Sequence, residues 1–168
     1  FYEANVDPSR PWILYADDVN PARTRFTILH ELGHHLLMTA AAELLDAIDT
    51  VGHLVIQVSG TIAITSKQGV RPNKTIVGVG SAPTITGGGF DFYKSSNVIV
   101  RNLTFTDAED DAINVGQQSH HIWIDHNTFR DKFTRDELLP VYFGRLYQVH
   151  DGHVDVTNAS DYVTVSWN

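Results

Sequence analysis

The segments VIVRNLTF (98–105), IWIDHNTF (122–129) and VTVSWN (163–168) decide the fold, because each is a short β-branched run followed by a polar turn. Their first residues lie 24 and 41 positions apart, and TIVGVG, which starts at Thr75, extends the series backward by a similar step (98 minus 75). A shorter strand precedes each of the three segments, ending at Phe92, Val115 or Val156. The repeating unit is therefore strand, polar turn, strand.

A period of this size, built from short strands, is typical of a solenoid in which each coil buries its apolar face only against its neighbours. We therefore predict a mainly β chain folded as a parallel β-helix. The longer step is interpreted as one coil plus an excursion over residues 130–150, and loops of that length are usually functional or disordered. A β-sandwich would require hairpin turns between adjacent strands, and only Asp151-Gly152 qualifies as one.

Residues 26–49 (FTILHELGHHLLMTAAAELLDAID) have a different composition, rich in Leu and Ala, with no Pro and one Gly. This composition predicts helix, either as one helix or as two helices broken near Thr39. We therefore expect a helical leader over residues 1–40 and a β-helix over residues 41–168.

The charge balance is acidic, with 12 Lys and Arg against 20 Asp and Glu, which gives a net charge of -8. Such a chain repels nucleic acid and other polyanions unless a cation intervenes. The absence of Cys excludes disulfides, thiolate zinc sites and cysteine nucleophiles. No apolar run reaches the length of about 18 residues needed for a membrane span, and no signal peptide is visible.

Acidic residues collect at one edge of the predicted coils, at Asp107, Glu109, Asp110, Asp111, Asp151 and Asp155. The separation of Asp111 and Asp151 along the chain is close to the longer coil step, and neighbouring coils are spaced by about 4.8 Å. Carboxylates at that distance favour a bridging cation, and Ca²⁺ prefers carboxylate oxygens. Aspartate also favours solvated turns, so the spacing alone leaves both interpretations open.

Further stretches extend this pattern into a series of motifs along most of the chain. They are VIQVSGTI (55–62), NKTIVGVGS (73–81), ITGGGF (85–90), SSNVIVRNLTF (95–105), DAINV (111–115), HIWIDHNTF (121–129), YFGR (142–145) and HDGHVDVTNASDYVTVSWN (150–168). With these motifs in collinear order, residues 41–168 resemble the secreted bacterial pectate lyases. The resemblance implies a right-handed parallel β-helix, here truncated at the C-terminus.

The same resemblance implies calcium ligands at Asp111, Asp151 and Asp155, and it makes Glu109 a candidate for a substrate-bridging calcium. The implied function is calcium-dependent β-elimination of polygalacturonate, an acidic polysaccharide that is reached through the ion. We expect a secreted monomer that acts on this polysaccharide, with neither nucleic acid nor membrane as a partner.

The family's catalytic Arg, with its Lys and Arg neighbours, follows the SWN-like segment, so the chain is expected to lack these downstream residues. None of the arginines in this part of the sequence occupies the matching position; they are Arg101, Arg130, Arg135 and Arg145. No catalytic residue is carried over for the lyase reaction.

A second motif is His30-Glu31-Leu32-Gly33-His34, within residues 13–37 that resemble the zinc metallopeptidases of mobile-element regulators. On a helix, His30 and His34 would share a face and bind Zn²⁺, with Glu31 acting on a bound water. This gives a zinc metallopeptidase as the alternative function. A β-helix that binds pectate without cleaving it is the second alternative.

Overall fold

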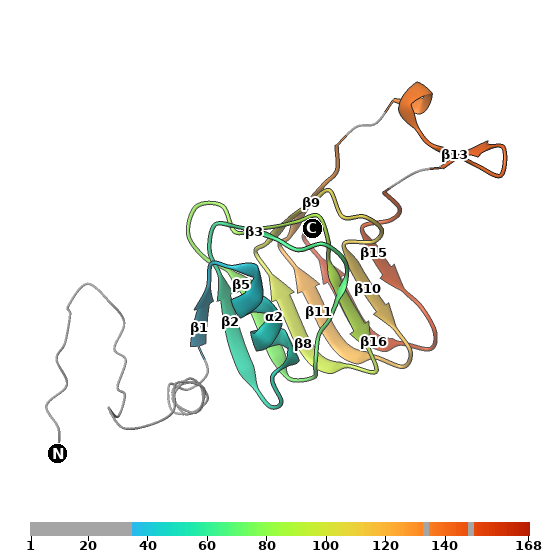
Figure 1. Cartoon of the computed structure of the whole chain (residues 1–168). Coiled ribbons are helices and arrows are strands. Elements are labelled where there is room, and N and C mark those ends of the chain that lie inside the picture. Colours follow the sequence, from blue (N-terminus) through green and yellow to red (C-terminus); the bar gives the residue numbers. More distant parts are fainter. Residues whose placement is uncertain (1–34, 133–134, 148–149) are drawn as a thin grey trace, which may run out of the picture.

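The computed structural model describes residues 35–132, 135–147 and 150–168, and within them the chain winds as a parallel β-helix with three parallel sheets (Figure 1). Sheet A contains β1 (His35–Met38), β2 (Leu54–Val58), β5 (Lys74–Gly78), β8 (Ser96–Arg101), β11 (His120–Asp125) and β16 (Asp161–Ser166). Sheet B contains β3 (Thr61–Ala63), β6 (Thr84–Thr86), β9 (Thr104–Thr106) and β12 (Thr128–Arg130). Sheet C contains β4 (Gln68–Gly69), β7 (Phe90–Tyr93), β10 (Ile113–Gly116) and β15 (Val154–Val156). The β-helix expected from the sequence is confirmed.

The register between coils follows the predicted spacing. Ile122 pairs with Val98 on one side and with Val163 on the other, as the two steps between the repeated segments predict. The earlier step is wrong by one position, because Lys74 rather than Thr75 pairs with Val98. Lys74 occupies an inward position, 1% exposed, and its ammonium donates to the carbonyl oxygens of Gly52 (2.7 Å) and Pro72 (3.0 Å).

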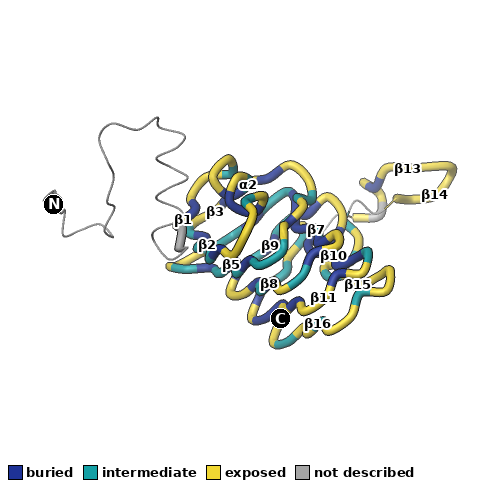
Figure 2. The backbone as a smooth tube through the Cα atoms, turned by 90° about the horizontal axis from the view of Figure 1, so that it is seen from below, coloured by how far each residue is buried: buried dark blue, intermediate teal, exposed yellow. Residues whose placement is uncertain are grey.

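The core is a set of columns that run from coil to coil. In sheet A, the successive partners Ile56, Ile76, Val100 and Ile124 are all fully buried. Figure 2 shows the buried residues alternating with less buried ones along these strands. Full burial of one such side chain stabilises the fold by about 1.5 to 3 kcal/mol. Because the partners that bury it lie in the neighbouring coils, the stability of each coil depends on the next.

The predicted helix over residues 26–49 is confirmed only in part. The helix α2 (Ala41–Asp49) is present, with Leu44, Ala47 and Ile48 buried, and it packs on β1, β2 and β4. Residues 35–38 are a strand instead, because β1 pairs in parallel with β2. Residues 26–34 lie outside the described residues. No described helix has the length and apolar character to cross a membrane.

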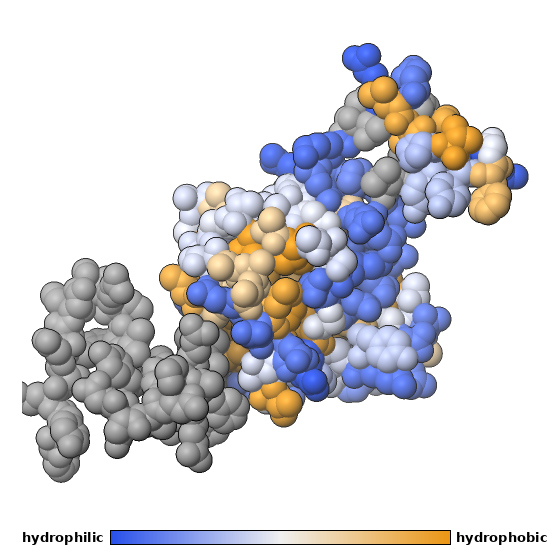
Figure 3. All heavy atoms as spheres, viewed as in Figure 1, coloured by the Kyte–Doolittle hydropathy of each residue, from blue (hydrophilic) through white to orange (hydrophobic). Residues whose placement is uncertain are grey.

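The longer step contains the expected excursion, which leaves the coils after β12. It includes a short 3-10 helix (Asp136–Leu138) and the antiparallel hairpin of β13 (Val141–Tyr142) and β14 (Arg145–Leu146). The hairpin stands away from the coils in Figures 1 and 2. Figure 3 shows hydrophobic residues gathered on it, and Phe143 at its tip is 99% exposed.

Asparagine amides hold the polar turns between sheets A and B. Asn127 is 3% exposed, and its Oδ1 accepts from the Leu103 amide (3.0 Å) while its Nδ2 donates to the Val100 carbonyl (3.1 Å). Asn168 repeats this arrangement one coil later, where its Oδ1 accepts from the Asn127 amide at 2.9 Å. These amides satisfy backbone groups that turn residues leave without a strand partner.

Replacing Asn127 by Ala leaves the Leu103 amide and the Val100 carbonyl without these partners, so we expect a loss of about 1 to 3 kcal/mol in the free energy of unfolding. Urea denaturation followed by circular dichroism measures it. Thr128→Ala, at the next and exposed position, is the matched control and should cost less than about 1 kcal/mol. Equal losses in the two variants would contradict this role of the amide.

Candidate functional site

The carboxylates of Asp110, Asp111 and Asp151 converge at the edge of sheet C. One oxygen from each lies within 4.8 Å of the others. Asp110 and Asp111 precede β10, and Asp151 precedes β15, the strand that pairs with β10 in parallel. We call these three residues, together with the neighbouring Asp155, the acidic cluster.

The strand register explains this convergence. Ile113 pairs with Val154, which sets the offset between the two strands. The same offset, applied to the residues that precede the two strands, places Asp110 beside Asp151 and Asp111 beside Gly152. The sequence spacing therefore predicted the meeting of the two segments, although the direct neighbour of Asp151 is Asp110 rather than Asp111.

Asp111 is the buried member of the cluster, at 7% exposure. Its Oδ2 is 3.1 Å from the ammonium of Lys67, whereas its buried Oδ1 has no hydrogen-bond partner among the described residues. Burial raises the pKa of Asp111, the hydrogen bond and charge of Lys67 oppose this rise, and the charges of Asp110 and Asp155 add to it. A cation close to Oδ1 would relieve this unfavourable environment.

Gly152 provides the space in front of that oxygen. A Cβ atom on Gly152 would lie 3.1 Å from Asp155 Oδ1 and 3.4 Å from Asp111 Oδ1. Both oxygens therefore border the same small volume, which a glycine leaves open. Asp155 itself is held in β15, where it pairs with Asn114, and the Asn114 amide donates to Asp91 Oδ1 at 2.8 Å.

The base of the excursion positions Asp151. His150 Nδ1 donates to the carbonyl oxygen of Ala108 at 2.5 Å, which ties the returning chain to the residues before β10. His153 Nδ1 lies 3.5 Å from Asp131 Oδ2 at the start of the excursion. The two ends of the excursion are therefore joined beside the cluster.

The donor set suits a hard divalent cation. Carboxylate oxygens are the ligands that Ca²⁺ takes in proteins, and the buried oxygen of Asp111 together with the open space at Gly152 provides a place for an ion. Glu109 is exposed and does not belong to the group of three converging carboxylates found among the described residues. Asp110, which the sequence placed at the same edge without naming it as a calcium ligand, joins Asp111 and Asp151 instead. Lys67, which contacts the cluster, was not predicted at all.

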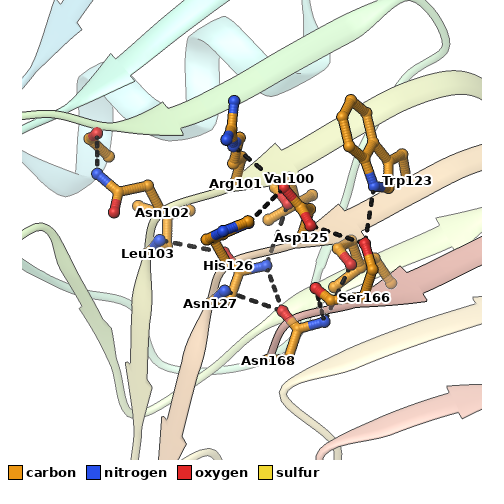
Figure 4. Close-up of polar contacts among 12 residues, drawn as sticks. Val100, Arg101, Asn102, Leu103, Trp123, Asp125, His126, Asn127, Ser166 and Asn168 are labelled. Atoms are coloured by element: carbon orange, nitrogen blue, oxygen red, sulfur yellow. Dashed lines mark hydrogen bonds and ion pairs between the residues drawn. The ribbon is translucent and has the colours of Figure 1, made fainter.

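A second polar cluster lies on the outer face of sheet A (Figure 4). Asp125, 1% exposed, accepts from Ser166 Oγ (2.7 Å) and His126 Nδ1 (2.7 Å) and pairs with Arg101 Nε (3.1 Å). The Trp123 indole donates to Ser166 Oγ at 3.1 Å. Burial raises the pKa of Asp125, but the hydrogen bonds from Ser166 and His126, with the charges of His126 and Arg101, bring it below its ordinary value. These contacts join β8, β11 and β16.

The residues of the zinc motif, His30, Glu31 and His34, lie outside the described residues. Their predicted arrangement on one helix face stays a prediction.

A family model described as pectate lyase matches residues 40–168. The chain belongs to the pectate lyase family. The match starts at residue 40, and the comparisons lend no support to the metallopeptidase resemblance of residues 13–37.

Individual pectate lyases agree with this assignment. A pectate lyase of Bacillus subtilis (strain 168) is 41% identical over 118 residues, which are 59% of this chain and 28% of the relative. A pectate trisaccharide-lyase of Thermotoga maritima is 37% identical over 150 residues, which are 81% of this chain and 36% of the relative. A crystal structure of a Bacillus sp. N165 pectate lyase in complex with trigalacturonate superimposes with a TM-score of 0.63 at 25% identity, covering 81% of this chain and 47% of that one. The chain thus spans about a third of the length of these curated relatives.

Asp125, in the polar cluster of sheet A, should make the free energy of unfolding depend on pH in the acid range. The folded pKa of Asp125 lies below the ordinary value of 3.8, so its ionised form stabilises the fold above that pH, and this contribution is lost as the pH falls through the lowered folded value. We expect Asp125→Asn to be less stable than wild type at neutral pH and to lose less unfolding free energy below about pH 4. Urea denaturation across this pH range measures both. Asp161→Asn, an exposed aspartate on β16, is the control, and equal pH slopes for wild type and Asp125→Asn would contradict the prediction.

Proposed function

We propose that this chain binds Ca²⁺ in the acidic cluster and, through the ion, binds polygalacturonate for β-elimination. Asp111, Asp151 and Asp155 would hold the ion, with Asp110 beside them. The observation that carries the proposal is the buried Asp111 Oδ1, which faces the space at Gly152 and lacks a hydrogen-bond partner in the described part of the chain.

The charge of the protein supports a bridging ion. Polygalacturonate is a polyanion, and the net charge of -8 repels it. When bound, calcium would supply positive charge that attracts a uronate carboxylate and acidifies the proton on the adjacent sugar carbon. The chain holds the carboxylates of the cluster on, or just before, the hydrogen-bonded strands β10 and β15, which would position the polysaccharide along sheet C.

We do not assign the base of the reaction to any of the arginines considered from the sequence, which are Arg101, Arg130, Arg135 and Arg145. Arg101 is bound to Asp125 on the outer face of sheet A, away from sheet C. Arg145 lies on the hairpin in β14 and Arg130 ends β12. The proposal therefore assigns no residue of this chain to proton abstraction. Glu109, exposed beside the cluster, stays the candidate for a further, substrate-bridging calcium.

The substrate is an acidic polysaccharide in this proposal, and the protein acts as a secreted monomer. Relatives named pectate lyase and pectate trisaccharide-lyase, and a structural neighbour in complex with trigalacturonate, support this substrate class.

Two measurements separate cleavage from binding alone. The absorbance of unsaturated uronate products, with and without Ca²⁺, reports lyase turnover, and retention on immobilised polygalacturonate reports binding. Retention that requires calcium supports the proposal, and its absence contradicts it.

Removing Asp151 tests the ion site. Asp151→Ala deletes one carboxylate of the cluster, so we expect the affinity for Ca²⁺ to fall by about 100-fold in isothermal titration calorimetry. Calcium-dependent retention on polygalacturonate should be lost with it. Asp161→Ala, which removes an exposed carboxylate from sheet A, should leave both unchanged. Undiminished calcium affinity in Asp151→Ala would rule out the assigned ligand.

Filling the space at residue 152 tests the position of the ion. The methyl group of Gly152→Ala would sit between Asp155 Oδ1 and Asp111 Oδ1, so we expect calcium affinity to fall by about tenfold or more. Gly69→Ala is the matched control in sheet C, because a Cβ there meets no atom of the described residues within 4 Å. Equal calcium affinities in the two variants would show that the ion does not occupy this space.

A further inference from the structure

Lys67 reaches the acidic cluster from two coils away. It precedes β4, and β7 lies between β4 and β10 in sheet C. Its ammonium is nevertheless 2.5 Å from Asp110 Oδ2 and 3.1 Å from Asp111 Oδ2. The Lys67 side chain is 25% exposed, so these contacts form in a partly desolvated setting.

Glycines in the intervening coil leave room for the Lys67 side chain to cross it. The segment before β7 is Gly87-Gly88-Gly89, where a Cβ on Gly88 would lie 2.3 Å from the Ser66 carbonyl oxygen and a Cβ on Gly89 would lie 2.1 Å from that of Ala112. The backbones of three coils therefore approach closely at this edge. A long side chain from the first coil can pass the second and contact the third.

The two oxygens of Asp111 have different environments. Oδ2 faces Lys67, while Oδ1 faces Gly152 and Asp155 and has no hydrogen-bond partner within the described ranges. Burial lowers the pKa of Lys67, but the hydrogen bonds and charges of Asp110 and Asp111 outweigh this effect and raise it above its ordinary value. The contacts of the Lys67 ammonium with Asp110 Oδ2 and Asp111 Oδ2 place a positive charge at one side of the cluster.

We propose that Lys67 is a built-in counter-ion of the acidic cluster, which competes with the divalent cation for Asp110 and Asp111 and so weakens calcium binding. The inference rests on the calcium site of the proposed function and specifies how the chain regulates it. Lys67 neutralises part of the carboxylate charge before calcium arrives, which stabilises the ion-free fold. It also repels the incoming ion over a few ångströms.

Lys67→Met tests the competition, because it keeps the length of the side chain and removes its charge. We expect calcium affinity, measured by isothermal titration calorimetry on the full chain, to increase by about tenfold or more. The rise in melting temperature caused by saturating Ca²⁺ should also be larger in the variant than in wild type. Lys67→Arg retains the charge and should keep an affinity near that of wild type.

Lys94→Met is the matched control for net charge. Lys94 is exposed after β7 and contacts the Tyr93 ring, so its removal changes the total charge equally without touching the cluster. We expect its effect on calcium affinity to stay within about twofold, because exposed charges are screened by salt. If Lys67→Met folds poorly, Lys67→Gln replaces it, with circular dichroism to confirm the fold.

The outcomes separate the two proposals. Tighter calcium binding in Lys67→Met, with Lys94→Met unchanged, supports the counter-ion. Equal or weaker binding in Lys67→Met, while wild type binds calcium and Asp151→Ala does not, overturns the counter-ion and leaves the calcium site standing. If neither wild type nor Lys67→Met binds calcium, the calcium site itself is wrong and the inference is overturned with it.

Discussion

The hydrogen-bonded register between successive coils is the constraint on which the fold and the acidic cluster both depend. Val100 pairs with Ile76 and Ile124, so its burial requires both neighbouring coils. The same kind of pairing sets the offset between β10 and β15 that brings Asp110 to Asp151. A slip of one position would turn inward side chains outward and would also separate these carboxylates. Stability and the candidate site therefore rest on the same interaction.

The sequence predicted the fold because apolar residues recur at the coil spacing, which is visible without coordinates. The prediction from sequence failed where a residue type is unusual for the position it occupies in the structure. Lys74 fills an inward position and satisfies its ammonium with two carbonyl oxygens, so the apolar pattern placed the register one position too late. His35–Met38 has the composition of a helix, yet it pairs with β2, which follows only after the whole of α2. Composition does not reveal such a pairing.

The candidate site, like the fold, could be predicted from the sequence only in part. Asp111 and Asp151 could be placed near each other because their separation approximates the coil step. Asp110, rather than Asp111, lies directly beside Asp151 because the offset set by the Ile113–Val154 pair is one position longer than the separation of Asp111 and Asp151. Lys67 could not be found from spacing, since its contact spans two coils and depends on the length of one side chain and on the glycines it passes.

The two buried aspartates, Asp125 and Asp111, differ in how far the described chain compensates their charge. Asp125 has partners for both oxygens, from Ser166, His126 and Arg101, and its pKa is lowered. Asp111 has a partner for one oxygen only, counting the described residues, and its pKa is raised. Both carboxylates are buried, but only the first is compensated within the described chain. An uncompensated buried carboxylate beside other carboxylates is stable when a cation joins it, and Lys67 supplies part of that charge from within the chain.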